Sequence, residues 1–174
     1  MRTAKARKAG KAGPAGISEA DRRFMAEAIA LSRKGMRRGD GGPFGALIVR
    51  RGEILSRGWN RVLVSADPTA HAEITAIRAA CRRLGAFSLE GCDLFTSCEP
   101  CPMCLGAAYW ARVDRLIYAN TRKDAAAIGF SDDFIYTELD RSPPRRRLPM
   151  IQLMRDEALL SFAEWRAKAD KTPY

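Results

Sequence analysis

The chain has 174 residues, of which 47% are hydrophobic and 29% charged, so it has an ordinary globular composition and enough length to form a core without crosslinks. No apolar run reaches the roughly eighteen residues that a membrane span needs, and the N-terminus lacks the apolar core of a secretory signal. The five cysteines show no spaced disulfide pattern. We therefore expect one cytoplasmic domain without membrane contact, in which clustered cysteines serve as metal ligands or nucleophiles.

The formal net charge of +10 is concentrated near the N-terminus. Residues 1–16 contain five Lys or Arg residues and no acidic residue, so the remaining chain carries +5. A segment of Ala, Gly and Lys cannot contribute to a core, so we expect a disordered basic tail at 1–16 and a folded domain at 17–174. The favoured interpretation of the tail is a solubilising extension. The alternatives are a transit peptide and a weak tether, the only part of the chain expected to contact nucleic acid.

Past the tail, the hydrophobic pattern alternates between helix and strand. Ser18 and Asp21 form a capping signature for a first helix, which Gly35 or Gly39 would end. The following elements are expected in chain order: strands on both sides of a turn at 51–52, a helix at 71–84, a buried strand at 92–97, a helix at 102–112, a strand at 114–120, helical segments in 122–139, a strand at 149–154 and a helix at 156–169. Strands interleaved with helices predict a layered α/β domain with helices on both faces of one sheet.

The segment "CEPCPMC" places Cys98, Cys101 and Cys104 at three-residue steps, which indicates a metal site. An iron–sulfur cluster would need a fourth nearby cysteine, and none follows. A closed structural zinc site would use all three cysteines together with His71, the only histidine in the chain. A catalytic zinc would use His71, Cys101 and Cys104 and would leave one position open to water.

The expected helix starts favour the catalytic zinc site over the closed structural site. Cys101 is expected to cap the helix that begins at Pro102, so its sulfur and that of Cys104 can converge at the first turn, where positive partial charge favours thiolates. Cys98 lies at a strand end and is expected to pack as a small apolar residue.

His71 and Glu73 form an H-x-E motif. Residues i and i+2 of a regular helix point to nearly opposite sides, so both can face one metal only if His71 lies at the very start of its helix. Glu73 would then stand beside the metal, where a carboxylate can move protons between water and a leaving group. H-x-E together with P-C-x-x-C is the known signature of the zinc nucleobase deaminases.

These motifs resemble those of the cytidine-deaminase-like zinc hydrolases. Within that family, "GGPFGALIV", "DPTAHAEITAIR", "TSCEPCPMCLGAAYWAR" and "IGFSDDFIYTEL" are similar to the bacterial guanine deaminases, over about Phe24 to Tyr174. The resemblance implies a three-layer α/β/α sandwich with a five-stranded mixed sheet and a zinc ion. It implies hydrolysis of guanine to xanthine and ammonia, as a step of purine catabolism, with zinc-bound hydroxide attacking C2. It also implies a homodimer that exchanges the C-terminal segments, about 155–174, so that each closes the partner's site.

Carried over residue by residue, the resemblance assigns the zinc ligands to His71, Cys101 and Cys104 and the proton shuttle to Glu73. It implies the following substrate contacts: Asn60 and the Ala72 backbone N–H on polar atoms of the purine, Phe44 and Trp110 as apolar walls, Asp132 on the N–H edge of guanine, Tyr174 completing the pocket, and Glu99 beside the site. From composition alone, both aromatic walls could equally be core residues and the aspartate could be merely solvated.

Two other functions remain open at the level of sequence. The tRNA adenosine deaminases share an Asn before "DPTAHAE" and a P-C-x-x-C helix, and the positive charge favours them. The residues "SCE" before the metal motif and the C-terminal "FAEWRAKADKTPY" are nearer to the guanine enzymes. A non-catalytic, zinc-stabilised RNA-binding module would need a fourth ligand such as Cys98 and would leave Glu73 without a role.

Overall fold

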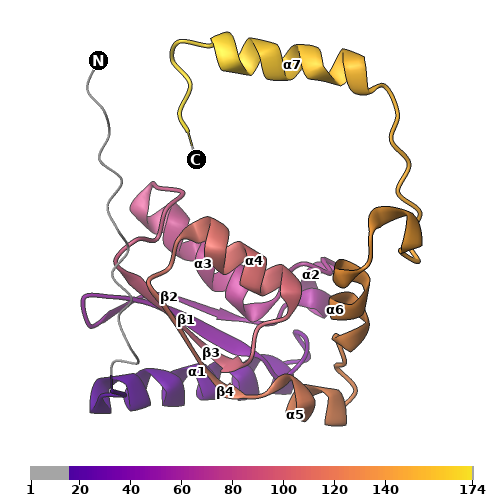
Figure 1. The fold of residues 1–174 in the computed structure, drawn as a ribbon. Helices are drawn as coiled ribbons and strands as arrows, with labels where there is room; N and C mark the ends of the chain where they lie inside the picture. Colours follow the sequence, from indigo (N-terminus) through magenta and orange to yellow (C-terminus); the bar gives the residue numbers. More distant parts are fainter. Residues whose placement is uncertain (1–15, 174) are drawn as a thin grey trace.

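The computed structural model describes residues 16–173, so the expected basic tail, apart from Gly16, and the expected pocket residue Tyr174 lie outside the described residues. Figure 1 shows the fold, which contains these elements: α1 (Glu19–Arg37), β1 (Gly45–Arg50), β2 (Glu53–Trp59), α2 (Val62–Ser65), α3 (Ala72–Leu84), β3 (Cys92–Cys98), α4 (Pro102–Ala111), β4 (Arg115–Asn120), α5 (Arg122–Ala127), α6 (Asp133–Asp140), the 3₁₀ turn η1 (Pro143–Arg145) and α7 (Arg155–Ala167). Within the described range, no helix has the length and apolar character needed to cross a bilayer.

The sheet is mixed, with strand order β2-β1-β3-β4. β1 pairs antiparallel with both β2 and β3, whereas β3 and β4 run parallel and are joined through α4. The expectation of five strands is wrong for the described residues, because the apolar segment 149–154 is an exposed linker. A strand forms where its backbone groups find a ladder partner, and this segment lies away from the sheet (Figure 1).

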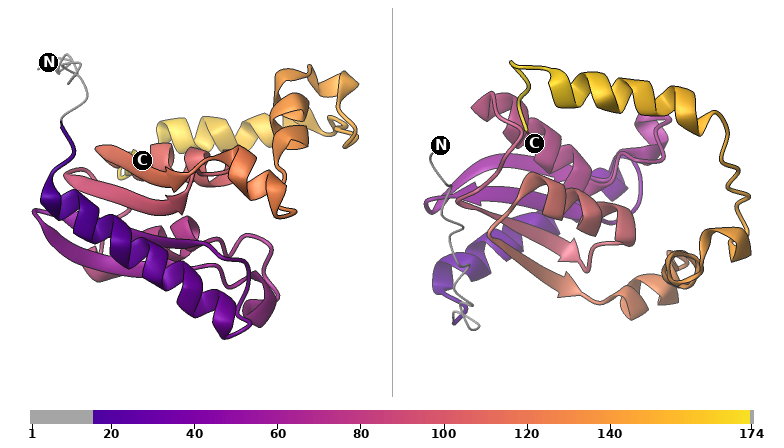
Figure 2. Two further views of the ribbon diagram at one scale, coloured as in Figure 1. Left: turned by 90° about the horizontal axis from the view of Figure 1, so that it is seen from below. Right: turned by 45° about the horizontal axis from the view of Figure 1, so that its top comes forward.

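Helices cover both faces of the sheet, as the alternating pattern predicted (Figure 2). On one face, Ala28 and Leu31 of α1 pack with Leu47 and Phe95 in one core cluster. On the other face, α3 and α4 pack over a second cluster that includes Ile48. Side chains alternate between the two faces along each strand, so β1 and β3 supply both cores.

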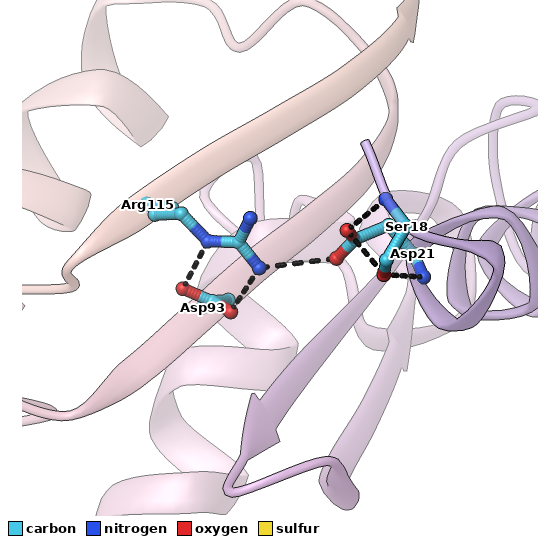
Figure 3. Close-up of polar contacts among 4 residues, drawn as sticks. All are labelled: Ser18, Asp21, Asp93 and Arg115. Carbon is cyan, nitrogen blue, oxygen red and sulfur yellow. Dashed lines mark hydrogen bonds and ion pairs between the residues drawn. The ribbon is translucent and has the colours of Figure 1, made fainter. Parts of the chain in front are cut away.

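The start of α1 is tied to the far edge of the sheet. Ser18 and Asp21 form the predicted capping box, in which the Asp21 backbone N–H donates to the Ser18 hydroxyl over 3.1 Å and the Ser18 N–H donates to the Asp21 carboxylate over 2.8 Å. The other carboxylate oxygen accepts a 3.0 Å bond from Arg115 on β4, which also binds both carboxylate oxygens of Asp93 on β3 (Figure 3). Hydrogen bonds from Ser18, and to a smaller extent the interaction with Arg115, lower the pKa of Asp21 and keep its carboxylate charged.

A close contact between β2 and α3 positions the turn that carries the candidate site. A Cβ added at Gly58 would lie 2.3 Å from the Ala72 carbonyl oxygen and 2.6 Å from the Ala76 nitrogen. Only glycine therefore allows α3 to rest directly on this strand. The Ser56 hydroxyl donates to the Ala76 carbonyl over 2.7 Å and fixes the same contact.

The chain leaves the three layers after α6. All residues from 147 to 170 are exposed, and α7 lies apart from the three layers in Figure 1 and in the right view of Figure 2. Its exposed side chains include Leu159, Leu160, Phe162 and Trp165. A helix that exposes this much apolar surface is typical of an interaction segment.

Candidate active site

Two helices begin at the centre of the site. His71 is the N-cap of α3 and Cys101 is the N-cap of α4, which has Pro102 at its first position, as predicted. Both N-caps have extended backbones, and neither side chain caps its own helix. The two side chains instead face each other, between two helix ends whose partial positive charge favours thiolates.

The three expected ligands lie at distances that suit a tetrahedral zinc ion. His71 Nδ1 is 3.6 Å from Cys101 Sγ and 3.5 Å from Cys104 Sγ, and all three ligand atoms lie within 4.8 Å of one another. Zinc bonds of about 2.3 Å to sulfur and about 2.1 Å to nitrogen would separate such ligands by about 3.6 Å. The residues therefore fit zinc, and three ligands leave its fourth position open.

The two ligand sulfurs differ in their affinity for a proton. The neighbouring Cys104 side chain, and to a smaller extent His71, lower the pKa of Cys101 to about 4. The same interaction raises the pKa of Cys104. One thiolate is thus favoured at neutral pH, and zinc binding would release the proton from the second sulfur.

Cys98 lies apart from the cluster. It is buried at the end of β3, and its thiol donates to the Thr121 carbonyl over 3.6 Å. Burial, and then the negative charge of Glu73, raise its pKa to about 11, so it remains a neutral thiol. A closed site with four protein ligands is therefore disfavoured.

Glu73 occupies the first turn of α3 and is only 5% exposed. Its Oε1 accepts a 3.1 Å hydrogen bond from the Thr96 hydroxyl, and its Oε2 accepts one of 3.4 Å from the Cys104 thiol. Burial raises the pKa of this carboxyl. A buried carboxyl beside a metal cluster, with a raised pKa, is suited to accepting and donating a proton near neutral pH.

A cavity of about 510 Å³ opens beside the cluster, which is the size of a small-molecule site. Its charged lining side chains, besides the metal ligands, are Glu73, Glu99, Asp132 and Arg122. Three carboxylates and one guanidinium make the cavity acidic, although the chain as a whole is basic. A neutral ligand with several N–H groups would complement it better than a phosphate would.

Asn60 presents a donor to this cavity. Its side-chain oxygen accepts the backbone N–H groups of Gly42 (3.3 Å) and Val62 (3.2 Å). Because only an oxygen can accept these bonds, they leave the amide NH₂ available as a donor on a residue that lines the cavity. A Cβ added at Gly41 would lie 2.1 Å from the Asn60 oxygen, so the glycine is required for this arrangement.

The apolar wall of the cavity is a pair of aromatic rings. Phe44 and Phe130 both line it, with ring centroids 5.0 Å apart and planes at 89°. A Cβ added at Gly42 would lie 2.9 Å from atoms of both rings. Phe44 was expected here from the resemblance, whereas Phe130 was not singled out.

The remaining expected substrate contacts differ in position. Asp132 lines the cavity, and burial raises its pKa. Glu99 also lines it, but one of its oxygens accepts the Arg122 backbone N–H over 3.0 Å. Ala72 is fully buried at the first position of α3, where a helix offers its N–H no acceptor. Trp110 is 72% exposed and is not among the residues lining the cavity of this chain. The binding roles of these residues stay predictions.

Comparison with known proteins identifies the family. Residues 18–120 match the zinc-binding region of the cytidine and deoxycytidylate deaminases. The chain belongs to this deaminase family. It is 52% identical to the guanine deaminase of Bacillus subtilis over 87% of this chain and 97% of the relative. The crystal structure of that enzyme matches with a TM-score of 0.86 and 51% identity, over 88% of this chain and 98% of the other.

Other members of the deaminase family are less similar. The guanine deaminase of Nitrosomonas europaea matches with a TM-score of 0.61 and 35% identity, over 67% of this chain and 66% of that structure. The tRNA-specific adenosine deaminase of Aquifex aeolicus is 43% identical over 58% of this chain and 66% of its own length. The predicted family and the zinc-binding His/Cys/Cys cluster are thereby confirmed.

Two residues of this deaminase site had no clear signal in the sequence. Thr96 touches Glu73 from β3, and Phe130 meets Phe44 from the loop after α5. Both contacts join segments far apart in the chain, so neither spacing nor periodicity indicates them. Phe130 follows Gly129, whose φ of 93° lies in the region that favours glycine, and that glycine was the only local hint of a turn.

Proposed function

We propose that this protein is a zinc-dependent guanine deaminase, which hydrolyses guanine to xanthine and ammonia. The observation that carries the proposal is the 52% identity to the Bacillus subtilis guanine deaminase over nearly its whole length. The His71, Cys101 and Cys104 cluster beside the buried Glu73 supplies the chemistry that such an enzyme needs.

The cavity lining supports a purine base with several N–H groups as the ligand. Guanine carries such donors along its N1 and 2-amino edge, and the carboxylates of Asp132 and Glu99 can accept them. The amide NH₂ of Asn60 can donate to a ring nitrogen or to the carbonyl oxygen. The rings of Phe44 and Phe130 would cover a face of the base and exclude water.

In the proposed reaction, Glu73 moves the protons. A zinc ion held by His71, Cys101 and Cys104 would supply an acidified water molecule for hydrolysis at C2. The Oε2 of Glu73 faces the cluster, where it can accept the proton of that water. The same carboxyl can then deliver protons to the ring nitrogen beside C2 and to the departing amine, so that xanthine and ammonia leave.

The tRNA adenosine deaminases are more distant relatives, and their similarity covers a smaller part of this chain. The acidic cavity also disfavours the phosphates of an RNA loop next to the site. A zinc-stabilised module without catalysis leaves the buried Glu73 unexplained, and its fourth ligand would have to be Cys98, whose thiol lies on the Thr121 carbonyl.

We also propose that the enzyme is a cytoplasmic homodimer that acts in purine catabolism and exchanges the C-terminal segments, about 155–174. The exposed apolar face of α7 supports an exchange, because one chain alone leaves it uncovered. The five free cysteines suit a reducing compartment. We propose that the basic tail, outside the described residues, is a solubilising extension, and that any contact with nucleic acid would be made through it.

The substitution Glu73→Gln tests the proposed function. The variant should keep the fold and about one zinc per chain, because Glu73 is not a ligand. It should lose ammonia release from guanine by at least roughly 10²-fold, since the amide cannot carry the proton. Turnover close to that of the unchanged enzyme would remove Glu73 from the mechanism.

A further inference from the structure

Thr96 provides a buried hydroxyl behind the proposed proton shuttle. We propose that Thr96 is a positioning residue, which holds the Glu73 carboxylate in the orientation that proton transfer requires. The inference rests on the proposed guanine deaminase function. It adds a residue from β3 to the metal cluster and the proton shuttle, which lie at the starts of α3 and α4.

The surroundings of Thr96 are apolar. The residue is fully buried on β3, on the face that packs against α3, and its partner across the ladder is Ala46. Leu94, two residues earlier on the same face, belongs to the core cluster. A valine side chain would have nearly the same shape and would need no hydrogen bond. A buried hydroxyl is unfavourable unless it is bonded, and the side-chain bond described for Thr96 goes to Glu73 Oε1, over 3.1 Å.

The two oxygens of Glu73 have different partners. Oε1 faces Thr96, and Oε2 faces the Cys104 thiol over 3.4 Å. Cys104 must give up its proton to bind zinc, so its thiol cannot continue to donate in the metal-loaded enzyme. The hydroxyl of Thr96 is then the remaining side-chain donor described on this carboxylate. It restrains the carboxylate from the sheet side and leaves Oε2 directed toward the cluster.

Restraining a reacting group matters because proton transfer depends steeply on distance and angle, and a displacement of about 1 Å can cost roughly 10²-fold in rate. A ligand that merely occupies the cavity does not need this carboxylate to be aligned. Loss of the Thr96 hydroxyl should therefore reduce kcat while leaving KM and zinc binding almost unchanged.

The variants Thr96→Val and Thr96→Ser separate the hydroxyl from the volume of the side chain. Each variant is compared with the wild-type enzyme in zinc per chain and in kcat and KM for guanine. The equilibrium affinity for hypoxanthine is also measured, because hypoxanthine lacks the 2-amino group and cannot be deaminated at C2. A crystal structure of each zinc-loaded variant gives the Glu73 rotamer. Ser97→Ala is the matched control, since Ser97 is also buried on β3 but its hydroxyl accepts the Gly45 N–H over 3.0 Å.

We expect Thr96→Val to keep about one zinc per chain and to lower kcat by roughly 10- to 100-fold. Its KM and hypoxanthine affinity should stay within about twofold, and Glu73 should adopt an altered or mixed rotamer. Thr96→Ser should return kcat to within about threefold of the unchanged enzyme, and Ser97→Ala should stay in that range.

A kcat for Thr96→Val within about threefold of the unchanged enzyme would overturn the proposal, and so would a Thr96→Ser variant as impaired as the valine. Parallel loss of zinc or of hypoxanthine binding would mean that the hydroxyl is structural. If Thr96→Val does not fold, Thr96→Ala is measured in the same way, and failure of both to retain zinc also rejects the proposal. If the wild-type protein releases no ammonia from guanine, that result instead rejects the proposed function itself.

Discussion

Single residues at two helix starts determine the metal chemistry of this deaminase. His71 and Cys101 are N-caps whose side chains turn away from their own helices and toward each other. Cys104 completes the cluster one turn into α4, and Cys98 stays on the strand with its thiol on a backbone carbonyl. The three residues proposed to bind zinc are therefore separated from the nearby Cys98, which is not expected to bind it.

This separation predicts the metal content of three variants. His71→Ala and Cys101→Ala should each lose most of the zinc, because two remaining ligands bind it poorly. Cys98→Ala should keep about one zinc per chain, since it removes a neutral thiol outside the cluster. Elemental analysis of the purified proteins measures this. Loss of zinc from Cys98→Ala would show that the site is closed and structural.

The Asn60 amide gives a second prediction at this scale. In Gly41→Ala, the added Cβ would clash with the Asn60 side-chain oxygen and displace the amide. We expect the KM for guanine to rise by roughly tenfold with zinc retained, the loss of about one well-placed hydrogen bond to the base. Gly106→Ala is the control, because a Cβ there meets no atom within 4 Å. An unchanged KM in Gly41→Ala would argue against a role for Asn60 in binding.

The residues predicted correctly are those whose geometry is local. A helix start orders only a few residues, so the H-x-E and P-C-x-x-C spacings were enough to predict the metal cluster. Thr96 and Phe130 act across segments that meet only in the folded sheet, and their contacts depend on the register of β3 and on the turn at Gly129. A single sequence has no local pattern that indicates such contacts.

At the scale of secondary-structure elements, two ion pairs join helix α1 to the sheet. The ion network of Arg115 joins the N-terminus of α1 to β3 and β4. A second ion pair, between Arg57 on β2 and Glu27 on α1, also joins α1 to the sheet, but both of its side chains are largely exposed. The side chain of Asp21 in the first network is only 7% exposed.

The two ion pairs should differ in their contribution to stability. Arg115→Met should lower the free energy of unfolding by about 1–3 kcal/mol, because it leaves a buried carboxylate without its charged partner. Arg57→Met is the matched control and should cost only about 0–1 kcal/mol. Urea denaturation at neutral pH measures both. Equal losses in the two variants would mean that burial of Asp21 does not strengthen its ion pair.

The boundaries of most elements were predicted well because caps and glycines mark them. The capping box at Ser18 and the left-handed Gly85 lie where the sequence indicated. The strand expected at 149–154 is the clear failure. Its apolar residues are equally compatible with a strand and with an extended linker that another surface covers. Only the surrounding structure distinguishes these two alternatives.

At the scale of the whole molecule, the C-terminal segment exposes apolar side chains that a single chain leaves uncovered. Its apolar residues are exposed, and the resemblance to the bacterial guanine deaminases implies that the segment closes the partner's site. The net charge of +10 should keep the protein soluble, whereas the cavity itself is acidic.

Deletion of residues 171–174 should leave the zinc content and the proposed dimer intact. It should reduce kcat/KM for guanine by at least roughly tenfold, about 1.4 kcal/mol of transition-state binding. Mixing this variant with Glu73→Gln chains should restore part of the activity, since each heterodimer regains one complete site. Full activity of the shortened enzyme would rule out the closing role, and verified heterodimers without rescue would place each tail over its own site.

The central claim, deamination of guanine, is tested most directly by ammonia release from a panel of substrates. The purified zinc-loaded protein is incubated separately with guanine, adenine, cytosine, cytidine and an adenosine-containing tRNA stem-loop, and ammonia is measured for each. We expect rapid release from guanine, with xanthine as the product, and release from the other four slower by at least roughly 10²-fold. Release from the stem-loop but not from guanine would contradict the claim and identify the protein as an RNA deaminase.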